Sequence, residues 1–483
     1  MKQEGVLSIG ILRELPPPDT AAADEALRVE LEQDGRKVVV LDDDPTGVQT
    51  VHGVPVYTDW EPDTLREGFA EDGRMFFILT NSRAMTAPQA AAANREMAQA
   101  IDAASRATDK DYILISRSDS TLRGHYPLET AVLRSTLEEL GAQPFDGEIL
   151  CPFFQEGGRY TLGNIHYVAE GESLVPAGQT EFAKDATFGY TASGLPEWCE
   201  EKTGGEARAE DAVCIALEDL RALRYEKITE QLMGVRGFGK VIVNSADYAD
   251  VKVFITCFLR ASRAGKRFLF RTAAAVPKVL GGVPDRPLLT RAELAPEESR
   301  NGGIVLVGSH VNKTTRQLEA LRDCSHPLEF IEFDQHMVVQ PGGLEDEVAR
   351  VVKLAQEMIV AGRSVAVYTR RDRFDLSGAD ADRQLEISVR ISDAVTSIVG
   401  LMTVRPGFIV AKGGITSSDV GTKALRVHRA IVMGQIRPGV PVWMTGPESK
   451  FPGMPYVIFP GNVGEQDTLR QVVEILTGAD PGK

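Results

Sequence analysis

The sequence predicts an α/β protein with two domains, each built on a largely parallel β-sheet flanked by helices. Three observations support this prediction. The chain has 483 residues, enough for two or three domains at roughly 100–200 residues each. Short, wholly apolar runs alternate with helical stretches, which is typical of strands buried on both faces of a sheet. Polar residues gather directly after those runs, at the edge where open α/β sheets bind ligands.

The chain begins with a predicted leader, residues 1–36. A Pro-Pro-Pro-Asp sequence acts as a breaker with a helix cap, and residues 20–32 then follow a helical pattern. We expect this leader to serve as a packing or oligomerisation arm and not to take part in catalysis.

Residues 37–285 are predicted to form the first domain. Apolar runs at residues 38–41, 75–79 and 112–115 are expected strands, and the alanine-rich residues 88–107 are an expected helix. Residues 157–210 are rich in Gly, Thr and Glu and lack clear periodicity. We expect loops and short strands there, near a substrate site.

A second α/β block follows. Residues 286–303 are rich in Pro, Glu and Arg and without periodicity, so they are the predicted linker. Residues 304–307 form the apolar run that opens the second domain, predicted to span residues 304–483.

Composition excludes several classes of protein. Acidic residues outnumber basic ones 69 to 53, and the resulting net charge of −16 disfavours nucleic acid as the main partner. The five cysteines include no C-x-x-C pair, so structural zinc and a disulfide framework are both poor interpretations. No membrane-spanning run or signal peptide is evident, and a cytoplasmic protein is expected.

Three adjacent carboxylates, Asp42, Asp43 and Asp44, follow the first strand of the first domain and precede Pro45-Thr46-Gly47. Such a set can act as a general base or bind a metal ion or sugar hydroxyls. Asp, Pro and Gly also favour turns, so a solvated turn is the plain alternative. Asp42 and Asp44 together also resemble the opening signature of haloacid-dehalogenase-like phosphatases, in which the first aspartate is the nucleophile. No clean downstream pair of acidic metal ligands completes that signature.

Residues 116–125 form a second polar loop after a strand, with two arginines, four hydroxyl side chains and Asp119. Guanidinium groups bind carboxylates in a bidentate manner, whereas hydroxyls and aspartate bind polyol hydroxyls. Arg83, which follows the preceding strand, is expected to join this loop. The combination favours a small hydroxy acid over a nucleotide, while ordinary surface ion pairs remain the alternative.

Three glycine-containing turns follow strands of the second domain, at Ser309, at Gly413–Thr416 and at Gly461. Glycine lets a backbone approach a phosphate closely, and hydroxyl side chains add donors. Each turn alone could be only a tight turn, but together they favour a nucleotide site. Neither a Walker sequence nor a G-x-G-x-x-G sequence is present, which disfavours a P-loop ATPase and an ordinary Rossmann dehydrogenase. The seven histidines show no metal-ligand spacing, and no metal ligand is assigned.

These motifs occur in one order along the chain, and in that order they resemble the four-carbon acid sugar kinase family. The resemblance covers about residues 37–475, and its most specific parts are Asp43–Gly47 and Asp119–Gly124. It implies a sugar-acid domain followed by a nucleotide domain, with the active site in the cleft between them. It also implies ATP-dependent phosphorylation of threonate, erythronate or 3-oxo-tetronate, with a role in carbohydrate metabolism. The ATP contacts that it implies are Ser309, Gly413, Gly414, Ile415, Thr416 and Gly461.

On this basis we expect the substrate carboxylate near Arg83 and Arg123. Its hydroxyls are expected at Asp43, Asp44, Asp119 and Ser120, with Asp44 orienting or deprotonating the attacking hydroxyl. ATP and Mg²⁺ are the expected cofactors, and a homo-oligomer is left open. The alternatives are the phosphatase built on Asp42 and Asp44, and a sugar-acid-binding protein without catalysis.

Overall fold

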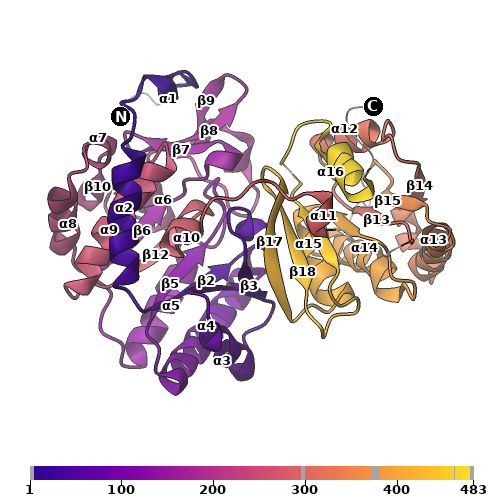
Figure 1. The fold of residues 1–483 in the computed structure, drawn as a ribbon, viewed down its shortest axis with the longest axis horizontal. Helices are drawn as coiled ribbons and strands as arrows, with labels where there is room; N and C mark the ends of the chain where they lie inside the picture. The colour runs from indigo at the N-terminus through magenta and orange to yellow at the C-terminus, as the bar shows by residue number, and fades with distance from the viewer. Residues whose placement is uncertain (1–4, 295–299, 373, 375–380, 462, 479–483) are drawn as a thin grey trace. The chain divides into compact units, whose positions relative to one another are not determined.

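The computed structural model describes residues 5–294, 300–372, 374, 381–461 and 463–478. The chain divides into two compact units, one of residues 1–47 and 59–285, the other of residues 48–58 and 286–483. Both are α/β units, so the predicted fold class is confirmed (Figure 1). The central part of the predicted linker, residues 295–299, lies outside the described residues.

The main sheet of the first unit has the strand order β10-β11-β6-β12-β5-β2-β4, and every neighbouring pair is parallel. Its core strands carry Val, Ile, Leu and Phe side chains that are almost wholly buried, because helices cover both faces. The strands are β2 (Lys37–Asp42), β4 (Met75–Leu79), β5 (Tyr112–Arg117), β6 (Gly147–Cys151), β10 (Val213–Ile215), β11 (Gly239–Val243) and β12 (Phe268–Thr272).

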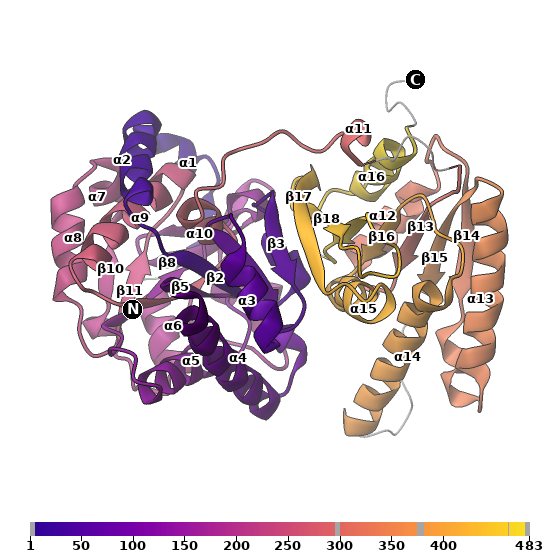
Figure 2. The same cartoon turned by 60° about the horizontal axis from the view of Figure 1, so that its bottom comes forward.

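Two groups of helices flank this sheet and pack among themselves. Figure 2 shows α9 and α4 on opposite sides of β2 and β5. The first group is α2 (Thr20–Glu32), α7 (Leu217–Arg221), α8 (Tyr225–Gly234), α9 (Tyr248–Arg263) and α10 (Ala275–Leu280). The second group is α3 (Pro62–Ala70), α4 (Ala87–Thr108) and α5 (Leu128–Glu139).

The irregular segment after β6 forms short strands and turns, as predicted. β7 (Arg159–Leu162), β8 (Ile165–Glu170) and β9 (Ser173–Pro176) make a small antiparallel sheet, which β1 (Leu7–Ser8) of the leader extends. The 3₁₀ turn η5 (Glu181–Lys184) and helix α6 (Leu195–Lys202) follow. The leader also contains the short helix α1 (Ile11–Glu14).

The second unit has the strand order β3-β17-β18-β19-β16-β13-β15-β14, antiparallel from β3 to β19 and parallel beyond. Its strands are β13 (Ile304–Val307), β14 (Leu328–Phe333), β15 (Ser364–Thr369), β16 (Ile409–Lys412), β17 (Arg429–Arg437), β18 (Val440–Thr445) and β19 (Pro455–Phe459). Its helices are α11 (Arg291–Leu294), α12 (Asn312–Leu321), α13 (Gly343–Val360), α14 (Ala381–Leu401), α15 (Gly414–Asp419) and α16 (Thr468–Thr477).

Strand β3 (Val54–Tyr57) comes from the N-terminal part of the chain but pairs with β17 of the second unit. Sequence analysis assigned all of residues 37–285 to the first domain and did not predict that residues 48–58 join the second unit. Pairing between strands about 375 residues apart leaves no local signal, because periodicity reports only which faces of a strand are buried. Among the described residues, no helix has the length and apolar character that crossing a membrane requires.

Helix α2 is the predicted helix of the leader, and it packs on α9. Asp19 caps it by accepting a hydrogen bond from the Ala22 amide at 3.0 Å. Ala23, Leu27 and Glu30 form its buried face. The buried Glu30 carboxylate accepts hydrogen bonds from Arg260, at 2.8 Å, and from Arg263. These two hydrogen bonds fasten α2 to α9.

We therefore predict that Glu30→Gln loosens α2. Losing charge-assisted hydrogen bonds of about 1.5–3 kcal/mol should speed amide exchange in Thr20–Glu32 by roughly tenfold or more. Glu25→Gln is the control, because the Glu25–Arg28 pair on the same helix is exposed and exposed pairs contribute only about 0–1 kcal/mol. Hydrogen-exchange mass spectrometry measures both, and equal exchange rates in the two variants would contradict this role for Glu30.

Candidate functional site

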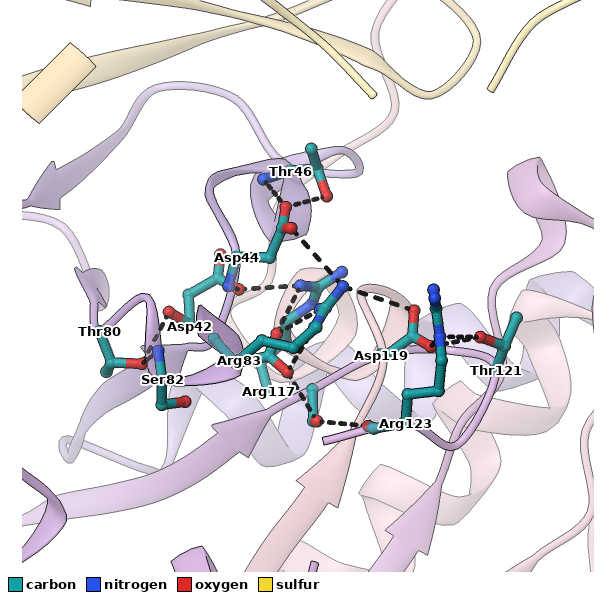
Figure 3. A network of polar contacts seen from close by, with 12 residues as sticks. Asp42, Asp44, Thr46, Thr80, Ser82, Arg83, Arg117, Asp119, Thr121 and Arg123 are labelled. Carbon is teal, nitrogen blue, oxygen red and sulfur yellow. Dashed lines mark hydrogen bonds and ion pairs between the residues drawn. The ribbon is translucent and has the colours of Figure 1, made fainter. Parts of the chain in front are cut away.

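Three parallel strands of the first unit end side by side. Asp42, the last residue of β2, lies opposite Leu79 of β4 and Arg117 of β5 in the register of the sheet. The polar residues that follow each strand therefore meet at one edge. Figure 3 shows their side chains converging from three separate loops. The structure brings together Asp43, Asp44, Arg83, Asp119 and Arg123, all of which the sequence indicated as site residues.

Arg83 is the centre of this network. Its guanidinium holds Asp43 in a bidentate pair, with Nη2–Oδ1 at 2.6 Å and Nε–Oδ2 at 3.2 Å. Its Nη1 lies 3.5 Å from Asp44 and 3.8 Å from Asp119. Burial alone would lower the pKa of Arg83, but the three carboxylates, Asp43 foremost, hold it well above its usual value. Arg83 therefore carries a fixed positive charge that positions three aspartates.

Asp42 is enclosed under the backbone. Its Oδ1 accepts a hydrogen bond from Arg117 Nη1 at 2.9 Å, and burial raises its pKa to about 7 against the opposing effect of Arg117. A Cβ atom on Gly47 would lie 2.1 Å from the same oxygen. Glycine is therefore required at this point of the motif, and Gly47 shields the carboxylate of Asp42.

Asp44 is the most accessible of the three adjacent carboxylates. Its side chain is 16% exposed, whereas those of Asp43 and Asp42 are 3% and 2% exposed. Its Oδ1 accepts hydrogen bonds from the Thr46 amide, at 2.8 Å, and the Thr46 hydroxyl, at 2.5 Å. Burial would raise the pKa of Asp44, but Arg83 and Thr46 lower it below its ordinary value. Asp44 is thus a reachable, ionised carboxylate in a fixed orientation.

The loop after β5 is held by its own side chains. Asp119 accepts hydrogen bonds from the Thr121 hydroxyl and from Arg123 Nε, the latter at 2.8 Å. Burial opposes ionisation, yet Arg123 and then Arg83 keep the pKa of Asp119 far below its usual value. Leu122 is buried in an apolar cluster, which anchors the loop beneath these polar groups. The carbonyl oxygen of Ser120 lies 2.8 Å from His166 Nε2.

Sequence analysis missed part of this site. Arg117 was one of several residues in the loop motif, but its pairing with Asp42 depends on register. Arg271, at the end of β12, donates to the Arg123 carbonyl at 3.0 Å and to Ser118 Oγ at 3.2 Å. Its guanidinium lies 5.3 Å from the Tyr126 ring and 5.1 Å from the Trp198 ring. Its only signal in the sequence is a basic residue inside an apolar run.

The second unit has a corresponding edge at the ends of β13, β16 and β19, where Val307, Lys412 and Phe459 lie level. Gly413 has a φ of +126°, and a Cβ there would lie 3.2 Å from that of Ser309. A Cβ on Gly461 would lie 3.5 Å from Ser309 Oγ. The three predicted glycine turns therefore meet in space.

The remaining predicted nucleotide contacts lie beside this point. Thr416 lies against Gly308, because a Cβ atom added to Gly308 would be 2.3 Å from Thr416 Oγ1. Gly414 and Ile415 begin helix α15, and Ile415 is 62% exposed. An exposed isoleucine next to a glycine turn leaves an apolar surface open at this edge.

Two cations at the same edge were not predicted as site residues. Lys412 Nζ donates to the carbonyls of Pro460, at 2.5 Å, and Gly461, at 3.2 Å, and burial lowers its pKa to about 7 with a further contribution from Lys313. Arg371, just after β15, donates to Thr315 Oγ1 at 2.9 Å, while its buried Nη1 has no hydrogen-bond partner among the described residues. Neither side chain has a carboxylate partner in the part of the chain that the structure describes, and basic side chains next to glycine turns suit a phosphate ligand. Within the described ranges, no group of three or more His, Cys, Asp or Glu side chains could hold a metal ion.

Comparisons with known proteins also match the chain in two parts. A family model described as a sugar-binding N-terminal domain matches residues 38–280 and alone spans just over half of the chain. A second model, described as a nucleotide-binding C-terminal domain, matches residues 304–469. No curated protein matches the sequence significantly.

Solved structures share the fold at low sequence identity. The Haemophilus influenzae protein HI1011 is 16% identical with a TM-score of 0.58, over 91% of this chain and 100% of that one. A Salmonella typhimurium LT2 protein, provisionally assigned as a tRNA synthase, is 15% identical with a TM-score of 0.62, over 90% and 98% of the two chains. A Bordetella bronchiseptica protein, a domain-swapped dimer with bound citrate, is 20% identical over 91% and 98% of the two chains, and its TM-score of 0.37 is too low to support an argument.

His166 generates a prediction on pH. It is buried between Thr161 Oγ1 and the Ser120 carbonyl, and burial lowers its pKa from 6.5 to about 4. Between these values the unfolded chain binds about one proton more than the folded chain at this position. The contribution of the buried, neutral His166 to the free energy of unfolding is therefore fully present above pH 6.5 and is lost as the pH falls towards 4.

We expect His166→Gln to make the free energy of unfolding of the first unit depend less steeply on pH, by about one proton in this range. Urea unfolding at a series of pH values measures that slope. His336→Gln, which changes a half-exposed histidine of the second unit, is the control. Equal slopes in wild type and His166→Gln would show that His166 is not buried in its neutral form.

Proposed function

The chain belongs to the four-carbon acid sugar kinase family, and we propose that it uses ATP to phosphorylate a hydroxyl of a four-carbon sugar acid. Threonate, erythronate and 3-oxo-tetronate are the proposed substrate types. The observation that carries this proposal is the contrast between the two strand edges. One unit gathers aspartates and arginines, which suit a hydroxy acid. The other gathers glycine turns beside Lys412 and Arg371, which have no carboxylate partner among the described residues, and this combination suits a nucleotide.

In the first unit, Asp44 is proposed to orient the attacking hydroxyl. Its low pKa makes it a weak base, but phosphoryl transfer needs positioning and charge neutralisation more than a strong base. Asp43, Asp119 and Ser120 are proposed to hold the other hydroxyls. Arg83 was expected to bind the substrate carboxylate, but its nitrogens face three aspartates, so we assign it the positioning of Asp44.

In the second unit, the turns at Ser309, Gly413 and Gly461 are proposed to receive the phosphates of ATP. Arg371 supplies positive charge behind the turns, and Lys412, whose pKa is lowered to about 7, is partly protonated at neutral pH. Mg²⁺ usually binds through the phosphates and keeps several of its waters, so an all-protein cage is not required. When bound, it would neutralise charge on the β- and γ-phosphates.

The phosphatase alternative fits the geometry poorly. Its nucleophile would be Asp42, which is paired with Arg117 and covered by Gly47. An attacking carboxylate must reach a phosphorus atom, and the backbone of Gly47 stands in the way. Asp44, the exposed member of the set, occupies the third position of that signature and not the first.

The test is turnover of ATP with a panel of acids. Purified protein with ATP and Mg²⁺ is given both enantiomers of threonate and erythronate, the 3-oxo-tetronates, and the neutral tetritols. We expect ADP formation that depends on one or more of the acids. If none of the acids increases ADP formation, the protein is not a kinase for them. If an acid binds but is not phosphorylated, the protein is a sugar-acid-binding protein.

Asp44→Asn should reduce kcat by about 10²–10⁴, the usual contribution of a positioned acid or base, with little change in ATP affinity. The exposed Asp63→Asn serves as the control and should leave kcat unchanged. Steady-state kinetics measures both variants. A phosphoenzyme trapped on Asp42 during turnover would instead support the phosphatase chemistry.

Gly413→Ala should weaken ATP binding. Its φ of +126° is unfavourable for alanine, and the added methyl group would press on Ser309 at the expected phosphate position. Gly453→Ala is the matched control, because Gly453 of the same unit also has a positive φ, +61°, but has open space around it. Calorimetric titration with ATP should show weaker binding by Gly413→Ala only. If both variants bind as wild type does, the nucleotide lies elsewhere.

A further inference from the structure

A second arginine lies beside Arg123, and the proposed function leaves it without a role. Arg159 is the first residue of β7, in the segment of irregular sequence. Its backbone exchanges hydrogen bonds of 2.9 and 3.1 Å with Phe154. Gly158 precedes it with a φ of +73°, and a Cβ there would lie 2.8 Å from the Cβ of Ala169. The start of the Arg159 side chain is therefore held in one place.

The guanidiniums of Arg123 and Arg159 share one aromatic ring. Their Cζ atoms lie 5.1 and 5.7 Å from the centre of the half-buried Phe182 ring, on η5. Burial lowers the pKa of Arg159, Asp119 opposes that effect, and the charge of Arg123 adds to it. Two like charges held close together repel each other, and Asp119, which acts on both, offsets part of that repulsion. A further anion near both guanidiniums would offset more of it.

Among the described residues, not all of the donors of these two arginines have a hydrogen-bond partner. Arg123 directs Nε to Asp119, and its Nη1 lies 3.7 Å from Asp185. Arg159 donates from Nη1 to the Gly157 carbonyl, while its Nε is buried without a partner among the described residues. A buried guanidinium with unused donors is costly, and a bound anion would satisfy them. Arg83, whose fork is filled by Asp43, offers no such opening.

We infer that Arg159 and Arg123, on either side of the Phe182 contact, recognise the carboxylate of the substrate, and that Arg159 separates acids from neutral polyols. The inference rests on the proposed function. A carboxylate suits the planar guanidinium fork and carries a single charge. A phosphate carries more charge and would meet the nearby carboxylates of Asp119 and Asp185. The match of this unit to a sugar-binding model also favours the sugar acid over the nucleotide.

The experiment measures binding and turnover separately. Calorimetry gives the affinity for threonate, for neutral threitol and for ATP in wild type, Arg159→Met and Arg159→Lys. Arg134→Met is the matched control, since Arg134 also lies over a phenylalanine of this unit, 4.5 Å from the Phe238 ring, but is paired with Glu138. Thermal unfolding establishes that each variant is folded, and Phe182→Leu provides a second route should Arg159→Met not fold.

We expect Arg159→Met to weaken threonate binding by about 30-fold or more, the usual effect of truncating a desolvated charged partner. Arg159→Lys should be intermediate, because lysine keeps the charge but loses the fork. Threitol and ATP binding should be unchanged, and Phe182→Leu should weaken threonate binding alone. Arg134→Met should behave as wild type.

The outcomes separate this inference from the proposed function. Threonate bound and phosphorylated equally well by wild type and Arg159→Met would overturn the inference and leave the kinase standing. Threonate bound but never phosphorylated, with binding lost in Arg159→Met, would overturn the kinase and leave the carboxylate site standing. A loss of ATP affinity in Arg159→Met in place of threonate affinity would show that the arginines serve the nucleotide. Absence of binding of every four-carbon acid in the panel to wild type would overturn both.

Discussion

The bidentate pair between Arg83 and Asp43 is the interaction on which the sugar-acid site depends. Both groups are largely removed from water, where an unpaired charge would be strongly destabilising. The pair forms only because β2 and β4 are neighbours that end at the same level. Once formed, it leaves Arg83 Nη1 pointing towards Asp44 and Asp119, so the same guanidinium orients three carboxylates. Breaking the pair would leave the buried charges of Arg83 and Asp43 without their main partners.

The two units present opposite electrostatic characters at their strand edges. In the first unit every aspartate of the network lies next to an arginine. The guanidinium donors that have no carboxylate partner there are the ones proposed to select the substrate. In the second unit the glycine turns approach one another closely, and Lys412 and Arg371 remain without a carboxylate among the described residues. A kinase needs both, because the acceptor must be oriented and the charge of the transferred phosphoryl group must be neutralised.

Local sequence signals predicted much of this arrangement, and long-range contacts account for what they missed. Asp43, Asp44, Arg83, Asp119 and Arg123 were identified because each lies in a polar loop that follows an apolar strand, and the parallel register then brings these loops together. Helix α2 was predicted from its cap and its spacing. Strand β3 and Arg159 were missed, because the pairing of β3 with β17 and the contact of Arg159 with Phe182 join segments whose own sequences carry no periodic or motif signal. Burial of a lone arginine beside an aromatic ring can be seen only in three dimensions.

A crystal structure with threonate and a non-hydrolysable ATP analogue bound tests the central claim most directly. The account predicts the carboxylate of the acid on Arg159 and Arg123, with one of its hydroxyls against Asp44. It predicts the phosphates of the nucleotide against Ser309, Gly413 and Gly461. A phosphate group in contact with Asp42, or a nucleotide held by the aspartates of the first unit, would contradict it.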